Sequence, residues 1–81
     1  KKHLSMVVGV TLVNVITGKE KEVYVKMKEV PKVKDVYHVF GEFDFVVIIH
    51  ADSLSELNKT VDEIRKIPGI TKTQTIVGAE I

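Results

Sequence analysis

The hydrophobic positions of this chain follow two periods, one typical of strands and one typical of helices. Four segments are dominated by Val, Ile and aromatic residues, a composition too β-branched to favour a helix. These predicted strands cover residues 6–16, 33–40, 43–51 and 70–81. A helical period replaces the strand pattern between the first two segments and again between the last two.

The first predicted helix has one buried face. Val23, Met27 and Val30 recur at i, i+4 and i+7, with Lys and Glu between them. Residues 17–20 (TGKE) precede this face and match a capping box, in which a Thr hydroxyl and a Glu satisfy free N–H groups of the first turn. Pro31 ends the helix because it disfavours helical geometry in the residue before it.

The second predicted helix repeats this design. Residues 53–56 (SLSE) form another capping box, and residues 68–69 (Pro-Gly) end the helix. Its apolar stripe is made of Leu54, Leu57, Val61, Ile64 and Ile67.

The two halves of the chain correspond to each other. Pro31 corresponds to Pro68 and Val33 to Ile70, an offset of 37 positions. Each half is strand, helix, strand. Two such halves predict a single α+β domain over residues 1–81 with the ferredoxin-like order βαββαβ, in which a four-stranded antiparallel sheet carries two helices on one face.

Both faces of the predicted sheet are apolar. Side chains alternate across a strand, so one face meets the helices and the other meets solvent or a partner. In the first predicted strand, one face carries Val8, Val10, Leu12 and Ile16, and the other carries Val7, Val13 and Val15. In the third, one face carries Phe43, Phe45, Val47 and Ile49, and the other carries Val46 and Ile48. We therefore expect a second copy to cover the open face, giving a homodimer joined through the sheet (a dimeric α/β barrel). An unpaired sheet with two apolar faces is the alternative.

Composition narrows the class of protein. Lys and Arg number 12 against 11 Asp and Glu, so no excess of positive charge favours nucleic acid or a membrane surface. The absence of cysteine excludes disulfides and thiolate metal sites. No apolar run approaches the roughly 20 residues of a membrane span, and we expect a cytoplasmic protein. A charged fraction of 28% without cysteine is typical of thermophiles.

No recognisable catalytic motif is present, and we expect no enzyme activity, cofactor or resident metal. The chain lacks a nucleophile elbow, a P-loop and a dinucleotide fingerprint. His38 and His50 lie on adjacent predicted strands, where a metal site competes with ordinary local hydrogen bonding. Asp44 and Asp52 flank the third strand, where carboxylates do acid–base work less often than they bond solvent or backbone N–H groups.

The turn at residues 39–45 (VFGEFDF) is the most informative segment. Its Gly-x-x-Asp spacing brings backbone N–H groups and the Asp44 carboxylate to one end of the sheet. Backbone amides can hold an α-carboxylate, and an Asp can hold an α-ammonium, so the turn is a candidate receptor for an amino acid. A structural turn in which Asp44 caps its own backbone fits the same spacing equally well.

The chain also resembles a known family. Residues 18–23 (GKEKEV), 30–45 (VPKVKDVYHVFGEFDF) and 66–77 (KIPGITKTQTIV) are similar to the C-terminal effector domain, or RAM domain, of Lrp/AsnC transcription regulators. The Gly-x-x-Asp turn and the Ile-Pro-Gly-Ile…Thr-x-Thr ending are the most specific parts, and the likeness extends over nearly the whole chain.

The resemblance implies a free amino acid as effector, held at the contact between dimers that assemble into octamers or decamers. It implies a site made of Gly41, Glu42, Phe43, Asp44, Thr73 and Thr75, to which we add His38 from the preceding strand. Amides near Gly41 would hold the carboxylate, Asp44 the ammonium, and the Thr hydroxyls would adapt to the side chain.

One departure from the family pattern matters. Full-length members carry an N-terminal helix-turn-helix, and nothing in these 81 residues resembles one. We therefore expect no direct DNA binding by this chain, whether it is a natural stand-alone form or an excised domain. It would sense an amino acid or assemble with full-length Lrp/AsnC proteins. The alternatives are a dimeric α+β-barrel enzyme and a ligand-free assembly domain.

Overall fold

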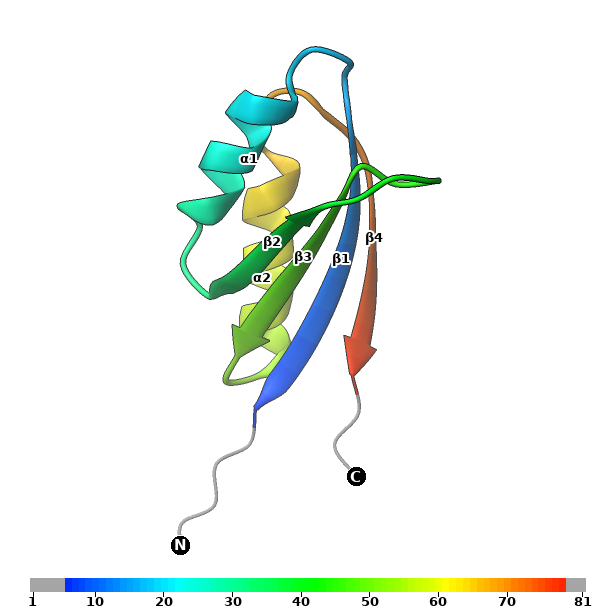
Figure 1. Cartoon of the computed structure of the whole chain (residues 1–81). Coiled ribbons are helices and arrows are strands. Elements are labelled where there is room, and N and C mark those ends of the chain that lie inside the picture. Colours follow the sequence, from blue (N-terminus) through cyan, green and yellow to red (C-terminus); the bar gives the residue numbers. More distant parts are fainter. Residues whose placement is uncertain (1–5, 79–81) are drawn as a thin grey trace, which may run out of the picture.

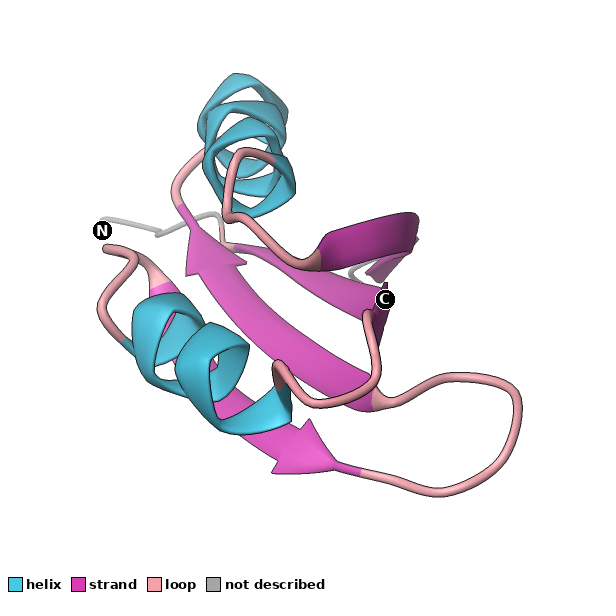
Figure 2. Ribbon diagram, turned by 90° about the horizontal axis from the view of Figure 1, so that it is seen from above, coloured by secondary structure: helices cyan, strands magenta, loops and turns pink. Residues whose placement is uncertain are grey.

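The strands and helices follow the predicted order. The computed structural model describes residues 6–78, with β1 (Val7–Val15), α1 (Glu20–Lys28), β2 (Val33–His38), β3 (Phe45–Ala51), α2 (Leu54–Arg65) and β4 (Ile70–Gly78). All neighbouring strands are antiparallel, in the order β2-β3-β1-β4. Both helices cover one face of the sheet (Figure 1), and the sheet twists strongly when seen from above (Figure 2). The ferredoxin-like βαββαβ prediction is confirmed.

The core lies between the sheet and the helices. Alternate β1 and β3 side chains point into it, so that Val13, Val47 and Ile49 have no exposed surface. From the helices, Met27 and Leu57 are equally buried. Each such side chain contributes about 1.5–3 kcal/mol by leaving water. The predicted buried faces are confirmed at Val23 and Met27 of α1 and at Leu57, Val61 and Ile64 of α2. Leu54 at the start of α2 is 53% exposed, and Val30 and Ile67 lie beyond the ends of their helices.

The two predicted capping boxes have different outcomes. The Ser53 Oγ accepts from the Glu56 N–H at 3.1 Å, as predicted, while the Glu56 carboxylate accepts from the Asp52 N–H at 2.6 Å. The Thr17 cap is wrong, because α1 starts later, with Lys19 as N-cap and no side-chain cap. The Glu20 carboxylate instead accepts from the Gly18 N–H at 2.9 Å.

The sheet face away from the helices carries a continuous apolar strip. Val10 of β1 pairs with Ile48 of β3 and with Ile76 of β4, and Leu12 pairs with Val46. The central residues of this strip are half-buried by their neighbours, whereas Ile76 at the edge is 52% exposed. The prediction that both faces are apolar is therefore confirmed. No helix in the described part of the chain is long and apolar enough to span a membrane.

Candidate functional site

The Gly-x-x-Asp turn joins β2 to β3 and projects away from the helices, to the right in Figure 1. The Val39 N–H donates to the Asp44 carbonyl at 2.9 Å and closes the turn. Gly41 has φ +129°, a conformation that side chains rarely adopt, and an added Cβ would meet nothing within 4 Å. Glycine is therefore needed for backbone conformation rather than for space. Phe43 lies in the turn and not in β3 as predicted, because β3 begins at Phe45.

Asp44 ties the turn to the end of β1. Its Oδ2 accepts from the Val15 N–H at 2.9 Å, and its own N–H donates to the Val13 carbonyl at 2.9 Å and to Asn14 Oδ1 at 3.1 Å. The Asp44 carboxylate thus bonds the backbone of another strand rather than that of its own turn. The other carboxylate oxygen has no hydrogen-bond partner among residues 6–78.

The tip of the turn presents donors without acceptors. Within the described chain, the backbone N–H groups of residues 40–43 donate to no other residue. Phe40, at the start of this run, is 94% exposed. Unpaired backbone amides that follow one another in a turn form a concave arrangement suited to a carboxylate.

Phe43 links the turn to β4. The Lys72 Nζ lies 5.5 Å from the centroid of the Phe43 ring, a cation–π distance. In the pairing of β4 with β1, Lys72 lies opposite Asn14. The Oδ1 of Asn14 accepts a hydrogen bond from the Asp44 N–H. Turn, β1 and β4 therefore meet at one end of the sheet.

Thr73 and Thr75 point to the helix side of β4. They pair with Val13 and Thr11, both fully buried on that side. Thr75 shares a hydrogen bond with Thr11 (Oγ1–Oγ1, 3.0 Å). The Arg65 Nε, at the end of α2, donates to the Thr73 Oγ1 at 2.9 Å.

Arg65 is a residue that sequence reasoning left out of the site. It lies between two surface hollows, one of about 340 Å³ and one of about 490 Å³. The first is lined by Arg65, Ile70, Thr71, Lys72 and Thr73, and the second by Asn58, Val61, Asp62, Arg65 and Thr75. The available signal was that Arg65 is the only arginine in the chain and is found where α2 leads into β4.

His38 lies apart from the two threonines. Its ring stacks on Phe45 at 4.8 Å on the α1 side of the sheet, beside a hollow of about 300 Å³ that Tyr24 also lines. Strands β3 and β1 separate it from Thr73 and Thr75 on β4. His50 lies at the far end of β3, paired with Val8, so the two histidines do not meet.

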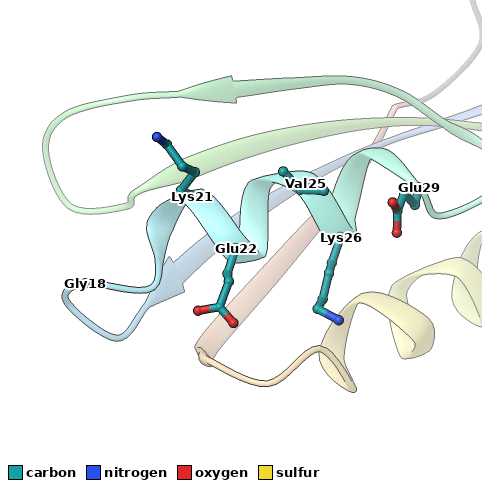
Figure 3. A pocket seen from close by; sticks show the side chains of 6 residues that line it. All are labelled: Gly18, Lys21, Glu22, Val25, Lys26 and Glu29. Carbon is teal, nitrogen blue, oxygen red and sulfur yellow. The ribbon is translucent and has the colours of Figure 1, made fainter.

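Another surface hollow contains none of the predicted site residues. It measures about 550 Å³ and follows the outer surface of α1 (Figure 3). Its lining residues are Gly18, Lys21, Glu22, Val25, Lys26 and Glu29. One protomer thus holds the predicted residues in three places: the turn, the β4 threonines beside Arg65, and His38 beside α1.

Fold and turn together define a ferredoxin-like domain with a Gly-x-x-Asp hairpin. The model of the Lrp/AsnC ligand binding domain matches residues 5–80, and the chain belongs to this family. The HTH-type transcriptional regulator FL11 of Pyrococcus horikoshii is 38% identical over 66 residues, which are 82% of this chain and 44% of FL11. The chain spans less than half the length of FL11 and also of the HTH-type transcriptional regulator LysM of Saccharolobus solfataricus, of which it covers 39%.

Solved structures agree with this assignment. A hypothetical protein of Pyrococcus horikoshii superimposes with a TM-score of 0.84 at 37% identity, covering 93% of this chain and 92% of that one. A feast or famine regulatory protein from M. tuberculosis, complexed with L-methionine, gives a TM-score of 0.78 at 14% identity over 93% of this chain and 51% of that one, which shows the fold alone. A homocitrate synthase of Sulfurisphaera tokodaii matches 50 residues at 32% identity, only 11% of that enzyme.

Proposed function

We propose that this chain is an amino-acid-binding regulatory module that self-associates and has no catalytic activity. The observation that carries the proposal is the turn, where one Asp44 oxygen and the N–H groups of residues 40–43 have no partner in the described chain. Unpaired donors beside an unpaired carboxylate oxygen match the two charged ends of a free amino acid.

Each group of the turn has a role in this proposal. The amides around Gly41, including those of Glu42 and Phe43, hold the α-carboxylate, and Asp44 holds the α-ammonium through its second oxygen. The hydroxyls of Thr73 and Thr75 form hydrogen bonds with the effector's side chain. His38 is also included in the proposed site. Membership of a ligand-binding family of transcription regulators, and the L-methionine bound by the M. tuberculosis relative, support an amino acid as the effector.

Assembly is the second part of the proposal. A second copy covers the apolar strip of the sheet, which includes Val10, Leu12 and Ile48, because a water-exposed strip of this kind otherwise favours aggregation. Dimers then associate into rings of eight or ten copies, with the effector at the contact between dimers. The output is regulation in the cytoplasm, without direct DNA binding by this domain, through full-length Lrp/AsnC proteins that share its assembly surfaces.

Thermal stability with each of the twenty amino acids tests the effector. A ligand present at about 100 times its Kd stabilises the folded state by about 2.7 kcal/mol. For a domain of this size, that is a rise in melting temperature of about 10 °C or more. We expect one amino acid, or a chemically related group, to produce the rise.

Asp44→Asn is the matched variant. Its amide oxygen can still accept from the Val15 N–H, so the turn keeps its anchor while losing the charge that would hold an ammonium. We expect the variant to fold and the ligand-induced rise to disappear. A chain that forms stable oligomers yet responds to no amino acid would instead be a ligand-free assembly domain.

A further inference from the structure

A hydrogen bond joins the side chains of Arg65 and Thr73, which both line the hollow of about 340 Å³ beside β4. Arg65 also lines the second hollow, together with Thr75, whose hydroxyl bonds Thr11 instead. Arg65 donates through Nε, so the hydroxyl of Thr73 keeps its own hydrogen for another acceptor. The guanidinium keeps the N–H groups of its two terminal nitrogens. The pair therefore presents a group of donors to the adjoining hollow of about 340 Å³.

Among residues 6–78, little competes for these donors. The Asp62 carboxylate lies 4.0 Å from the Arg65 guanidinium, at the outer limit of an ion pair. Both side chains are more than half exposed, and such pairs contribute little. The lining of the hollow contains no acidic residue.

We propose that Arg65 and Thr73 bind the side-chain carboxylate of the effector, so that the module selects an acidic amino acid, aspartate or glutamate. This inference rests on the proposed function, in which the turn holds the α-ammonium and α-carboxylate. A carboxylate accepts two or more hydrogen bonds and pairs with the charge of Arg65. A side-chain amide offers one acceptor oxygen and brings donors that find no acidic partner in this lining.

The complete site requires two copies. Thr73 points to the helix side of β4, whereas Lys72, the residue before it, extends towards Phe43 of the turn. The Arg65–Thr73 donors and the turn thus lie on opposite sides of the edge strand β4, and Lys72 lines the hollow of the first while contacting Phe43 of the second. An effector that reaches both is bound between the turn of one copy and the α2–β4 side of another.

Binding of the twenty amino acids to three variants tests the side-chain contact. Arg65→Gln should weaken aspartate or glutamate binding about ten- to hundredfold, the loss expected for a hydrogen bond to a charged group, and remove the preference over asparagine and glutamine. Arg65→Lys should restore part of the affinity. Lys66→Gln removes the same charge one residue further on, outside both hollows, and should bind as the unchanged protein does.

Mixed oligomers test the division between copies. Asp44→Asn and Arg65→Gln chains, co-expressed with different affinity tags and purified through both, pair an intact turn with an intact Arg65 in about a quarter of their sites. Calorimetric titration should find that fraction of wild-type sites, although neither variant alone binds strongly. Recovery of no sites would overturn the two-copy site.

The possible failures are distinguishable. If the unchanged chain binds no amino acid, both the proposed function and this inference are overturned. If it binds one, and Asp44→Asn abolishes binding while Arg65→Gln leaves affinity and preference unchanged, the proposed function stands and the role of Arg65 is refuted. Selection of an apolar amino acid such as methionine would refute the acidic preference in the same way.

Discussion

Replacing Asp44 by alanine should destabilise the fold in the absence of any ligand. The Asp44 Oδ2 is the acceptor for the Val15 N–H, and Val15 is only 8% exposed at the end of β1. Alanine leaves that N–H without its acceptor. A buried donor that loses its partner costs about 1–3 kcal/mol. For a domain of this size, about 2 kcal/mol corresponds to a fall in melting temperature of roughly 8–16 °C.

Asparagine at the same position separates hydrogen bonding from charge. Its side-chain oxygen replaces the Asp44 Oδ2 as acceptor for the Val15 N–H, so we expect the free energy of unfolding to stay within about 0.5 kcal/mol of the unchanged protein. The bond of the Asp44 N–H to the Val13 carbonyl is made by the backbone, and neither substitution removes it directly.

Urea unfolding followed by circular dichroism measures both variants. All proteins should be compared at one protomer concentration, because self-association adds to apparent stability. Equal m-values would show that the same surface is exposed on unfolding. If Asp44→Ala is as stable as the unchanged protein, the anchoring role is wrong. If the Asn and Ala variants lose stability equally, the negative charge matters and the hydrogen bond does not.

Three further predictions concern the core, the open face and a helix cap. A Cβ at Gly9 would lie 2.5 Å from Cδ1 of the buried Leu57, so Gly9→Ala should lower the free energy of unfolding by about 1–3 kcal/mol. In a double-mutant cycle measured by urea unfolding, Leu57→Ala should destabilise the Gly9→Ala variant less than it destabilises the unchanged protein. Val10→Lys places a charge in the apolar strip of the sheet, so the mass measured by light scattering should shift towards that of the monomer. A monodisperse oligomer of unchanged mass would contradict the sheet-to-sheet dimer. The Asp52 N–H and, secondarily, Lys32 lower the pKa of Glu56 below its ordinary value. Ionised Glu56 therefore stabilises the fold at pH values above its unfolded-state pKa, and this stabilisation is lost as pH falls through its folded-state pKa. The difference in melting temperature between Glu56→Gln and the unchanged protein should therefore narrow on acidification, and a pH-independent difference would rule out this linkage.

The fold could be predicted from local sequence because its signals are local. β-branched runs, helical spacing and the repeated Pro at 31 and 68 specify each element without reference to the rest of the chain. The failed Thr17 cap shows where local rules compete. Gly18 adopts φ +96° and continues the turn, and the Glu20 carboxylate bonds the Gly18 N–H, so α1 begins three residues after the predicted capping Thr.

The orientation of His38 depends on a feature that periodicity does not reveal. The pairing of β2 with β3 shifts between Val33 and Asp35, so that Val33 pairs with Ile49 and Asp35 with Ile48. Such a bulge reverses which side chains face the helices beyond it. Strict alternation from Val33 would place His38 on the open face, whereas the structure stacks it on Phe45 beside α1. The contact of Arg65 with Thr73 likewise depends on how α2 packs beside β4.

A site divided between copies links ligand binding to assembly. If the effector binds between the turn of one copy and the Arg65–Thr73 pair of another, as we propose, it binds only to the associated state. Ligand that binds one state and not the other stabilises that state by mass action, and assembly must in return raise the affinity for ligand by the same factor. The affinity for the effector should therefore rise with protein concentration until assembly is complete. A purely intramolecular site would show one affinity at every concentration.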